Sequence, residues 1–162
     1  MTECFSQLPY NFYQQRPLVV KFSELELSSE AGVLLARQAE EKVGICKRIA
    51  ECIEEWREPR KIRHRLEQLV SQRIYQIVGG YEDANDSNTL RHDPIYKIAC
   101  GGLPLSGEEL LASQPTMSRL ENHIGKKEIG AMRRKMVEGF IRRYQERPTE
   151  IILDIDGWDD PT

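Results

Sequence analysis

The sequence contains no apolar run approaching the roughly 20 residues of a membrane-spanning helix, and its N-terminus lacks the basic and apolar stretches of a signal peptide. These absences argue against a membrane-spanning or secreted protein. Cysteine is also scarce: Cys4, Cys46, Cys52 and Cys100 are scattered, and no two form a Cys-x-x-Cys pair. We therefore expect reduced thiols in a soluble cytoplasmic protein without a membrane partner.

Lysine and arginine are absent from residues 149–162, which carry five acidic side chains. Residues 1–55 contain 6 Lys or Arg and 9 Asp or Glu, whereas residues 56–148 contain 17 and 12. The formal net charge of −3 would by itself argue against a nucleic-acid-binding protein, yet it combines a basic middle with two acidic ends. The distribution of charge therefore indicates the partner better than the total does.

Helical periodicity dominates the chain, so we expect a mainly α fold. Residues 1–27 form an N-terminal segment with one strand-like run, 18–22, and residues 28–147 form a helical region. Hydrophobic residues make up 40% of the 162 positions, which is enough for a core. From the spacing of apolar residues and the positions of Ser, Gly and Pro, helices are expected at about 28–43, 45–58, 60–78, 94–100, 106–112, 115–122 and 126–147.

The third of these helices combines an apolar stripe with a basic start. The side chains expected to be buried are Ile62, Leu66, Leu69, Val70, Ile77 and Val78. Positive charge is unfavourable at the N-terminal end of a helix, because the helix dipole is positive there. The cations at this end therefore indicate a binding partner, although a solvated basic face is equally compatible; they are Arg60, Lys61, Arg63 and Arg65.

Residues 106–122 have the pattern of a helix-turn-helix unit. Two short helices are separated by a turn at residues 113–114, and the second opens with Pro115. In such a unit the second helix lies in the major groove with its first residues against base edges. The groove-facing side chains would be Gln114, Thr116, Ser118 and Arg119. The same pattern also occurs in helix pairs that only pack together.

The last expected helix, 126–147, carries many basic side chains. Its apolar stripe consists of Ile129, Met132, Met136, Phe140, Ile141 and Tyr144. A row of basic side chains suits a phosphate backbone, because each neutralised phosphate releases counterions. The candidates for DNA contact on the other face are Lys126, Lys127, Arg133, Arg134, Lys135, Arg142, Arg143 and Arg147.

Residues 150–157 change character and read as one β-strand that runs into a loop. Alternation places Asp154 and Asp156 on one face of that strand, roughly 7 Å apart. Two such carboxylates can hold a hard divalent cation, Mg²⁺ or Mn²⁺, as in two-metal phosphoryl chemistry. A strand end with its acids in solvent is the alternative.

Several separate motifs, in a fixed order, resemble those of bacterial insertion-sequence transposases of the DDE/DDD type. The similarity is to the insertion-sequence 1380 family, within transposase DDE domain group 1, and extends from about residue 12 to the last residue. The motifs are Gln72–Gln76, Gly80–Asp86, Leu90–Pro94, Ala112–Asn122 and Leu153–Pro161.

The resemblance implies a helical DNA-binding region followed by an RNase H-like α/β catalytic domain. In that family three acids hold two divalent metal ions, and the site cuts and joins DNA strands. The strand ending in Asp-Gly supplies the first acid, which by motif position is Asp156, with Asp154 as the alternative. Family members continue well beyond this point, so we expect residues 148–162 to begin a truncated catalytic domain that lacks the second and third acids.

We therefore expect an N-terminal part of a bacterial, nucleoid-associated transposase. It would bind double-stranded DNA, with a preference for the terminal inverted repeats of its element, and would neither transfer strands nor hold a metal stably by itself. One alternative is a non-enzymatic helix-turn-helix transcriptional regulator that reads an operator through residues 106–122. Another is a partner of intact transposase that reduces its activity.

Overall fold

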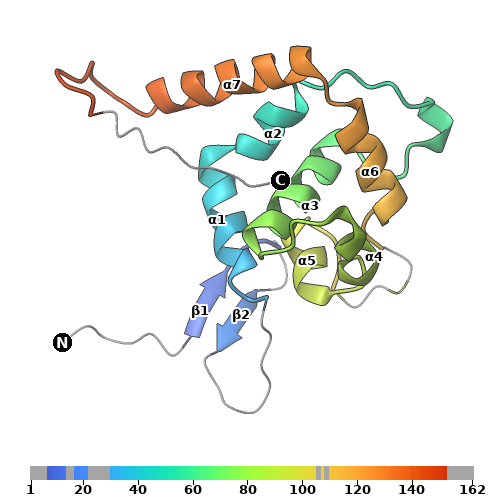
Figure 1. Cartoon of the computed structure of the whole chain (residues 1–162). Helices are drawn as coiled ribbons and strands as arrows, with labels where there is room; N and C mark the ends of the chain where they lie inside the picture. Colours follow the sequence, from blue (N-terminus) through green and yellow to red (C-terminus); the bar gives the residue numbers. More distant parts are fainter. Residues whose placement is uncertain (1–6, 14–16, 22–29, 105–106, 108–109, 153–162) are drawn as a thin grey trace.

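A computed structural model describes residues 7–13, 17–21, 30–104, 107 and 110–152 of the chain. These residues are mainly helical, which confirms the expected class. The helix α3 lies in the middle of the molecule, with α1 and α2 on one side and α6 on the other (Figure 1). In chain order the elements are β1 (Gln7–Tyr10), β2 (Leu18–Lys21), α1 (Val33–Val43), α2 (Ile45–Ala50), the 3-10 helix η1 (Pro59–Lys61), α3 (Leu66–Val78), the 3-10 helix η2 (Ala84–Asp86), α4 (Ser87–Leu90), α5 (Pro94–Ala99), α6 (Gln114–His123) and α7 (Lys126–Ile141).

The N-terminal segment forms a two-stranded antiparallel ribbon rather than a single strand. Leu18 of β2 pairs with Tyr10 of β1. The additional strand β1 contains Pro9, which a two-stranded ribbon tolerates because each strand there has a free edge. Tyr10 is buried with Leu34 and Ile98, so the ribbon covers the beginning of α1 and part of α5.

Two glutamines occupy the core where the sequence pattern predicts isoleucine and valine. Ile77 and Val78 are exposed, while Gln72 and Gln76 of the same helix are buried. The Gln72 side chain donates to the carbonyl of Ala112 and accepts from the Ala112 N–H, both at 2.9 Å. Burial of this amide is therefore compensated by hydrogen bonds, and the two bonds join α3 to the segment before α6.

The second and third helices are shorter than predicted. The α2 helix ends at Ala50 instead of continuing toward Pro59, and α3 begins at Leu66. Residues 51–65 form turns and the short η1, where Pro59 takes the first position and its missing N–H leaves no helical bond unmade. Arg60, Lys61 and Arg63 therefore lie in the connection before α3, and only Arg65 of the predicted cations stands at the helix start, as its N-cap.

The first helix of the predicted helix-turn-helix unit is absent at the positions that the structure describes. Residues 107 and 110–112 are not helical. The two hydrogen bonds from Gln72 hold the main chain of Ala112 in a geometry that replaces helical pairing. The second helix is present as α6, which begins at Gln114 and packs Met117 and Leu120 against α3 in the core.

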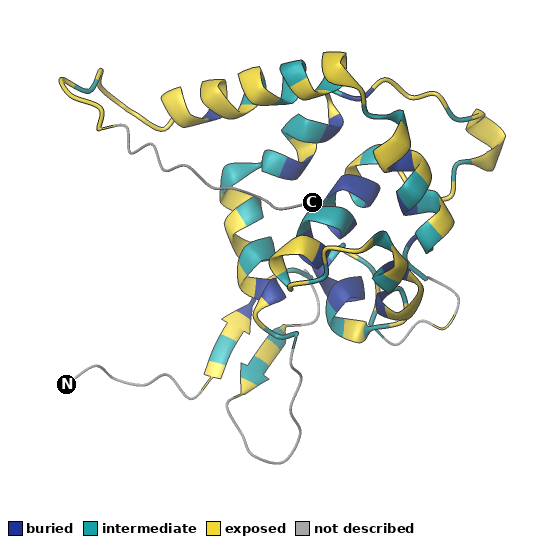
Figure 2. Ribbon diagram, viewed as in Figure 1, coloured by how far each residue is buried: buried dark blue, intermediate teal, exposed yellow. Residues whose placement is uncertain are grey.

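The last helix, α7, ends at Ile141 instead of residue 147 and lies along the outside of the molecule. It contacts α2, and Met132 packs at the edge of the core. Most of its length is exposed (Figure 2). The exposed side chains of the predicted apolar stripe are Ile129, Met136, Phe140 and Ile141 in the helix and Tyr144 after it. Of the expected strand at 150–157, residues 150–152 are not a strand, and the rest lies outside the described residues.

Candidate nucleic-acid interface

The connection before α3 and the helix α6 enclose a hollow with a cationic lining. We call it the basic hollow. Its volume is about 440 Å³, and its floor includes Leu69 and Leu111. The hollow combines Lys61, Arg63, Thr116 and Arg119, which the sequence pattern indicates as partner contacts, with three residues that it does not indicate: Arg57, His64 and Arg91.

Stacking and hydrogen bonds fix the wall of the basic hollow. The rings of Trp56 and His123 stack with centroids 3.8 Å apart and planes 17° apart, which joins the connection to the end of α6. The Arg57 guanidinium donates to the carbonyl of His64 at 2.8 Å and pairs with Glu55 at 2.6 Å. Segment 55–64 is thereby held in one shape beside α6.

Three of the arginines at the hollow have no carboxylate partner among the described residues. Arg57 is neutralised by Glu55 and Lys61 by Glu58, at 2.6 Å in each case. By contrast, no ion pair within the described ranges involves Arg63, Arg91 or Arg119. The Nε of Arg91 is also buried without a hydrogen-bond partner there. These groups come from three separate elements and leave a local excess of positive charge.

The pKa of His64 also reflects the positive charge at the hollow. Burial, and then the cations Arg91, Arg57 and Arg63, lower the pKa of His64 below its ordinary value. An anion bound at the hollow would stabilise the charged imidazole and offset this effect.

The other polar residues predicted on α6 do not line the hollow. The main-chain N–H of Gln114 donates to Oδ1 of Asn88 at 3.1 Å, and the Ser118 hydroxyl accepts from Asn122 at 3.2 Å. Arg65 is exposed and precedes α3, where its N–H donates to the Gln68 side chain. The structure therefore brings together only part of the predicted DNA-contacting set.

The basic side chains along residues 126–143 differ in whether an acid lies beside them. Lys126, Lys127, Arg133 and Arg134 are exposed, and none forms an ion pair with another described residue.

Toward the end of α7 the cations lie beside an acid or beside α2. Lys135 and Arg142 approach Glu138 at 3.6 Å and 3.9 Å. Lys135 and Arg143 also border a smaller hollow of about 170 Å³ against α2. The first half of α7 is thus the part with free positive charge.

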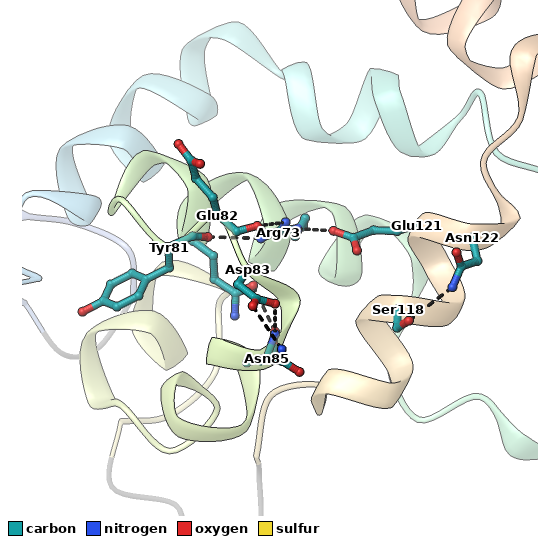
Figure 3. Close-up of polar contacts among 10 residues, drawn as sticks. Arg73, Tyr81, Glu82, Asp83, Asn85, Ser118, Glu121 and Asn122 are labelled. Carbon is teal, nitrogen blue, oxygen red and sulfur yellow. Dashed lines mark hydrogen bonds and ion pairs between the residues drawn. The ribbon is translucent and has the colours of Figure 1, made fainter. Parts of the chain in front are cut away.

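Arg73 connects three parts of the chain that carry the motifs noted in the sequence (Figure 3). Its guanidinium pairs with Glu121 of α6 at 2.5 Å and donates to the carbonyls of Tyr81 and Glu82. Asp83 caps the following η2 by accepting from the N–H of Asn85 at 2.8 Å. These motif residues position α6 against α3, so their role in the structure is architectural.

Comparison with protein-family models shows which family the chain belongs to. The model of the transposase DDE domain group 1 family matches residues 11–162, which is nearly the whole chain. The chain belongs to this transposase family. A search of curated proteins and a search of solved structures each found no match.

Transposase families of the DDE type generally use divalent metal ions. Within the described ranges, no group of three or more His, Cys, Asp or Glu side chains could hold such an ion. The candidate acids Asp154 and Asp156 lie outside the described residues. In the same part of this transposase chain, every helix is too short or too polar to cross a membrane.

The residues that sequence reasoning missed at this transposase surface are Trp56, Arg57, His64 and Arg91. Arg91 lies inside the motif Leu90–Pro94, so the motif could have indicated this residue as a candidate. The convergence of Arg91 with Arg63 and Arg119 depends on packing between residues that are distant in sequence. No local pattern contains that information.

Proposed function

We propose that this chain binds duplex DNA as the DNA-binding part of a bacterial insertion-sequence transposase of the insertion-sequence 1380 type. The target would be the terminal inverted repeats of its element. The observation that carries the proposal is the convergence of Arg63, Arg91 and Arg119 without carboxylate partners. Arginine suits this role because its guanidinium binds phosphate oxygens in a bidentate manner. The family membership supports a transposase over the alternative of a transcriptional regulator.

Two surfaces would contact the backbone of the duplex. The first is the rim of the basic hollow, and the second is the first half of α7 with Lys126, Lys127, Arg133 and Arg134. We assign Gln114 and Ser118, on α6, to base edges and Arg65, Lys135, Arg142 and Arg143 to further phosphates. Residues 28–147 would form the binding region, preceded by residues 1–27 and followed by the start of an RNase H-like catalytic domain.

A salt titration tests this proposal. Binding of a fluorescent inverted-repeat duplex should weaken steeply with salt, with a slope of about 0.9 in log affinity against log salt for each phosphate contact. Arg63→Gln with Arg119→Gln, and separately Arg133→Gln with Arg134→Gln, should each reduce the slope by about 2. Lys42→Gln, on the exposed surface of α1, is the control and should leave the slope unchanged.

The outcome that contradicts DNA binding is equally direct. If the chain shows no affinity for any duplex even at low ionic strength, the proposal is wrong. Equal affinity for the inverted repeat and a scrambled duplex would remove the terminal-repeat preference and leave only general binding to DNA.

We assign the first catalytic acid to Asp156, with Asp154 as the alternative, and a Mg²⁺ or Mn²⁺ ion held there would activate an attacking oxygen. Because the resemblance assigns only this first acid to residues 1–162, the chain by itself should show no metal-dependent cleavage of supercoiled DNA. Incubation with Mg²⁺ and gel analysis of nicked circles measures this. Nicking by the wild-type chain that disappears in Asp156→Ala would contradict the expectation.

A further inference from the structure

The basic hollow has an apolar floor as well as a cationic rim. Leu69 is 1% exposed and belongs to the main core behind the lining, so the half-buried Leu111 supplies the apolar surface next to Trp56. A B-form duplex keeps its bases paired and stacked, so it can present only phosphates and groove edges to such a hollow. A phosphate alone would satisfy the arginines and leave the apolar floor unused.

The aromatic wall points to the same kind of ligand. Trp56 is 36% exposed at the rim of the hollow, and stacking on His123 supports its ring. Arg57 holds the neighbouring chain in place through Glu55 and the His64 carbonyl. A wall that is already ordered loses little conformational entropy when a flat ligand packs against it.

Size and charge separate this hollow from the one between α2 and α7. That hollow is smaller, at about 170 Å³, and its lining includes Ile45, Ile49 and Phe140. The Arg48 guanidinium beside it already donates to the Val43 carbonyl at 2.6 Å. The basic hollow, at about 440 Å³, combines space for a base and sugar with unpaired arginines. A neighbouring hollow of about 530 Å³ shares Arg63 and Arg91 with it, but Trp56 and Arg119 line only the basic hollow of these two.

We propose that the basic hollow binds one unpaired nucleotide of a DNA strand, with its phosphate at Arg63, Arg91 and Arg119 and its base against Leu111 and Trp56. The inference rests on the proposed DNA binding and adds the strand form that the hollow selects. A phosphate beside the guanidinium would also bring an acceptor near the buried Nε of Arg91, which has no hydrogen-bond partner among the described residues. Base contact with aromatic and apolar groups tolerates any sequence, so the hollow selects an unpaired strand and not a particular base.

The test compares two DNA probes that differ only in unpaired nucleotides. One is a blunt duplex, and the other is the same duplex with three unpaired thymidines at one 3′ end. The full chain carries Trp158→Phe, so that Trp56 is its single tryptophan. The overhang duplex should bind at least about tenfold more tightly and quench the Trp56 fluorescence, because base stacking on an aromatic side chain is of this magnitude.

Two arginine variants separate the hollow from the general DNA surface. Arg119→Gln should abolish the preference for the overhang, and Arg63→Gln should reduce it. Arg133→Gln on α7 should weaken both probes by the same factor and leave the preference intact. Circular dichroism of each variant confirms that the fold is retained.

The outcomes distinguish the inference from the proposed function. Equal affinity for both probes without quenching of Trp56 overturns the inference, while duplex binding by itself remains. If Arg119→Gln weakens both probes equally, Arg119 contacts only backbone phosphate and the inference is also wrong. If neither probe binds at low salt, both the inference and the proposed function fail.

Discussion

The surface around the basic hollow and the helix α7 are both rich in lysine and arginine, but the structure supports them differently. The hollow is built from α3, α6 and a connection that stacking and ion pairs hold in place. The α7 helix touches the body mainly through α2, and much of its apolar surface is exposed. Regions of similar charge therefore differ in order. The first is held in one shape by stacking and ion pairs, and the second is a basic surface on a loosely attached helix.

The largest expected difference between the two regions is in stability. Leu120 of α6 is 2% exposed and belongs to the main core, whereas Ile141 of α7 is 61% exposed. Leu120→Ala should lower the free energy of unfolding by about 2–5 kcal/mol, because it removes buried surface and leaves a cavity. Ile141→Ala should change it by less than about 0.5 kcal/mol. Urea unfolding measures both, and equal losses would show that α7 is as firmly packed as α6.

A smaller change in the free energy of unfolding is expected for substitutions at the contact between α7 and α2. A Cβ at Gly139 would lie 2.8 Å from the Arg48 guanidinium, whereas one at Gly130 would have ordinary contacts only. Gly130→Ala should raise the free energy of unfolding by up to about 1 kcal/mol through helix propensity. Gly139→Ala should lack this gain, since Arg48 must move and weaken its bond to Val43.

Hydrogen exchange sharpens the result for these two glycines. In Gly139→Ala the amides of α7 should exchange faster, while those of α3 and α6 should be unchanged. Faster exchange throughout the protein would mean that α7 is part of the same cooperative unit as the core, and the contrast between the two regions would be lost.

The smallest expected effect concerns pH at the basic hollow. Because the pKa of His64 is lowered in the folded protein, the unfolded chain binds more protons as the pH falls through the ordinary histidine value of 6.5. This residue therefore contributes a loss of stability on acidification below that value. His64→Gln should reduce the fall in melting temperature between pH 7 and pH 5.5.

Binding of DNA gives the opposite change at the same residue. Phosphate near Arg63 and Arg91 would screen the cations that disfavour the charged imidazole, so the pKa of His64 should rise in the complex. An NMR titration of the imidazole with and without duplex measures the shift. An unchanged or lower pKa in the complex would place the bound DNA away from the hollow and favour α7 as the contact surface.

Local features of the fold were predictable because their causes lie within a few residues. Gly44 ends α1 with the positive φ of 66° that glycine adopts easily. Pro94 opens α5 after Asp93, whose carboxylate accepts from the N–H groups of Ile95 and Tyr96. Each depends on backbone preferences or on a side chain that reaches its own neighbours.

Features that depend on distant partners were not predictable in the same way. Apolar periodicity assigned Ile77 and Val78 to the core, but the helix is rotated so that Gln72 and Gln76 face inward. Only the main chain of Ala112, forty positions further along, explains why Gln72 can be buried. The helix predicted at 106–112 is absent at its described residues, 107 and 110–112, for the same reason.

By itself, the sequence of this protein determined the mainly helical class, the basic middle of the chain and the motifs shared with a transposase family. These follow from composition, periodicity and order, which need no knowledge of contacts. The tertiary structure alone decided which basic residues line one hollow. Arg63, Arg91 and Arg119 become one group because α3 and α6 pack against each other and Trp56 stacks on His123, and the arginines that lie near acids are neutralised. Charge is encoded along the chain, but whether it is compensated depends on folding.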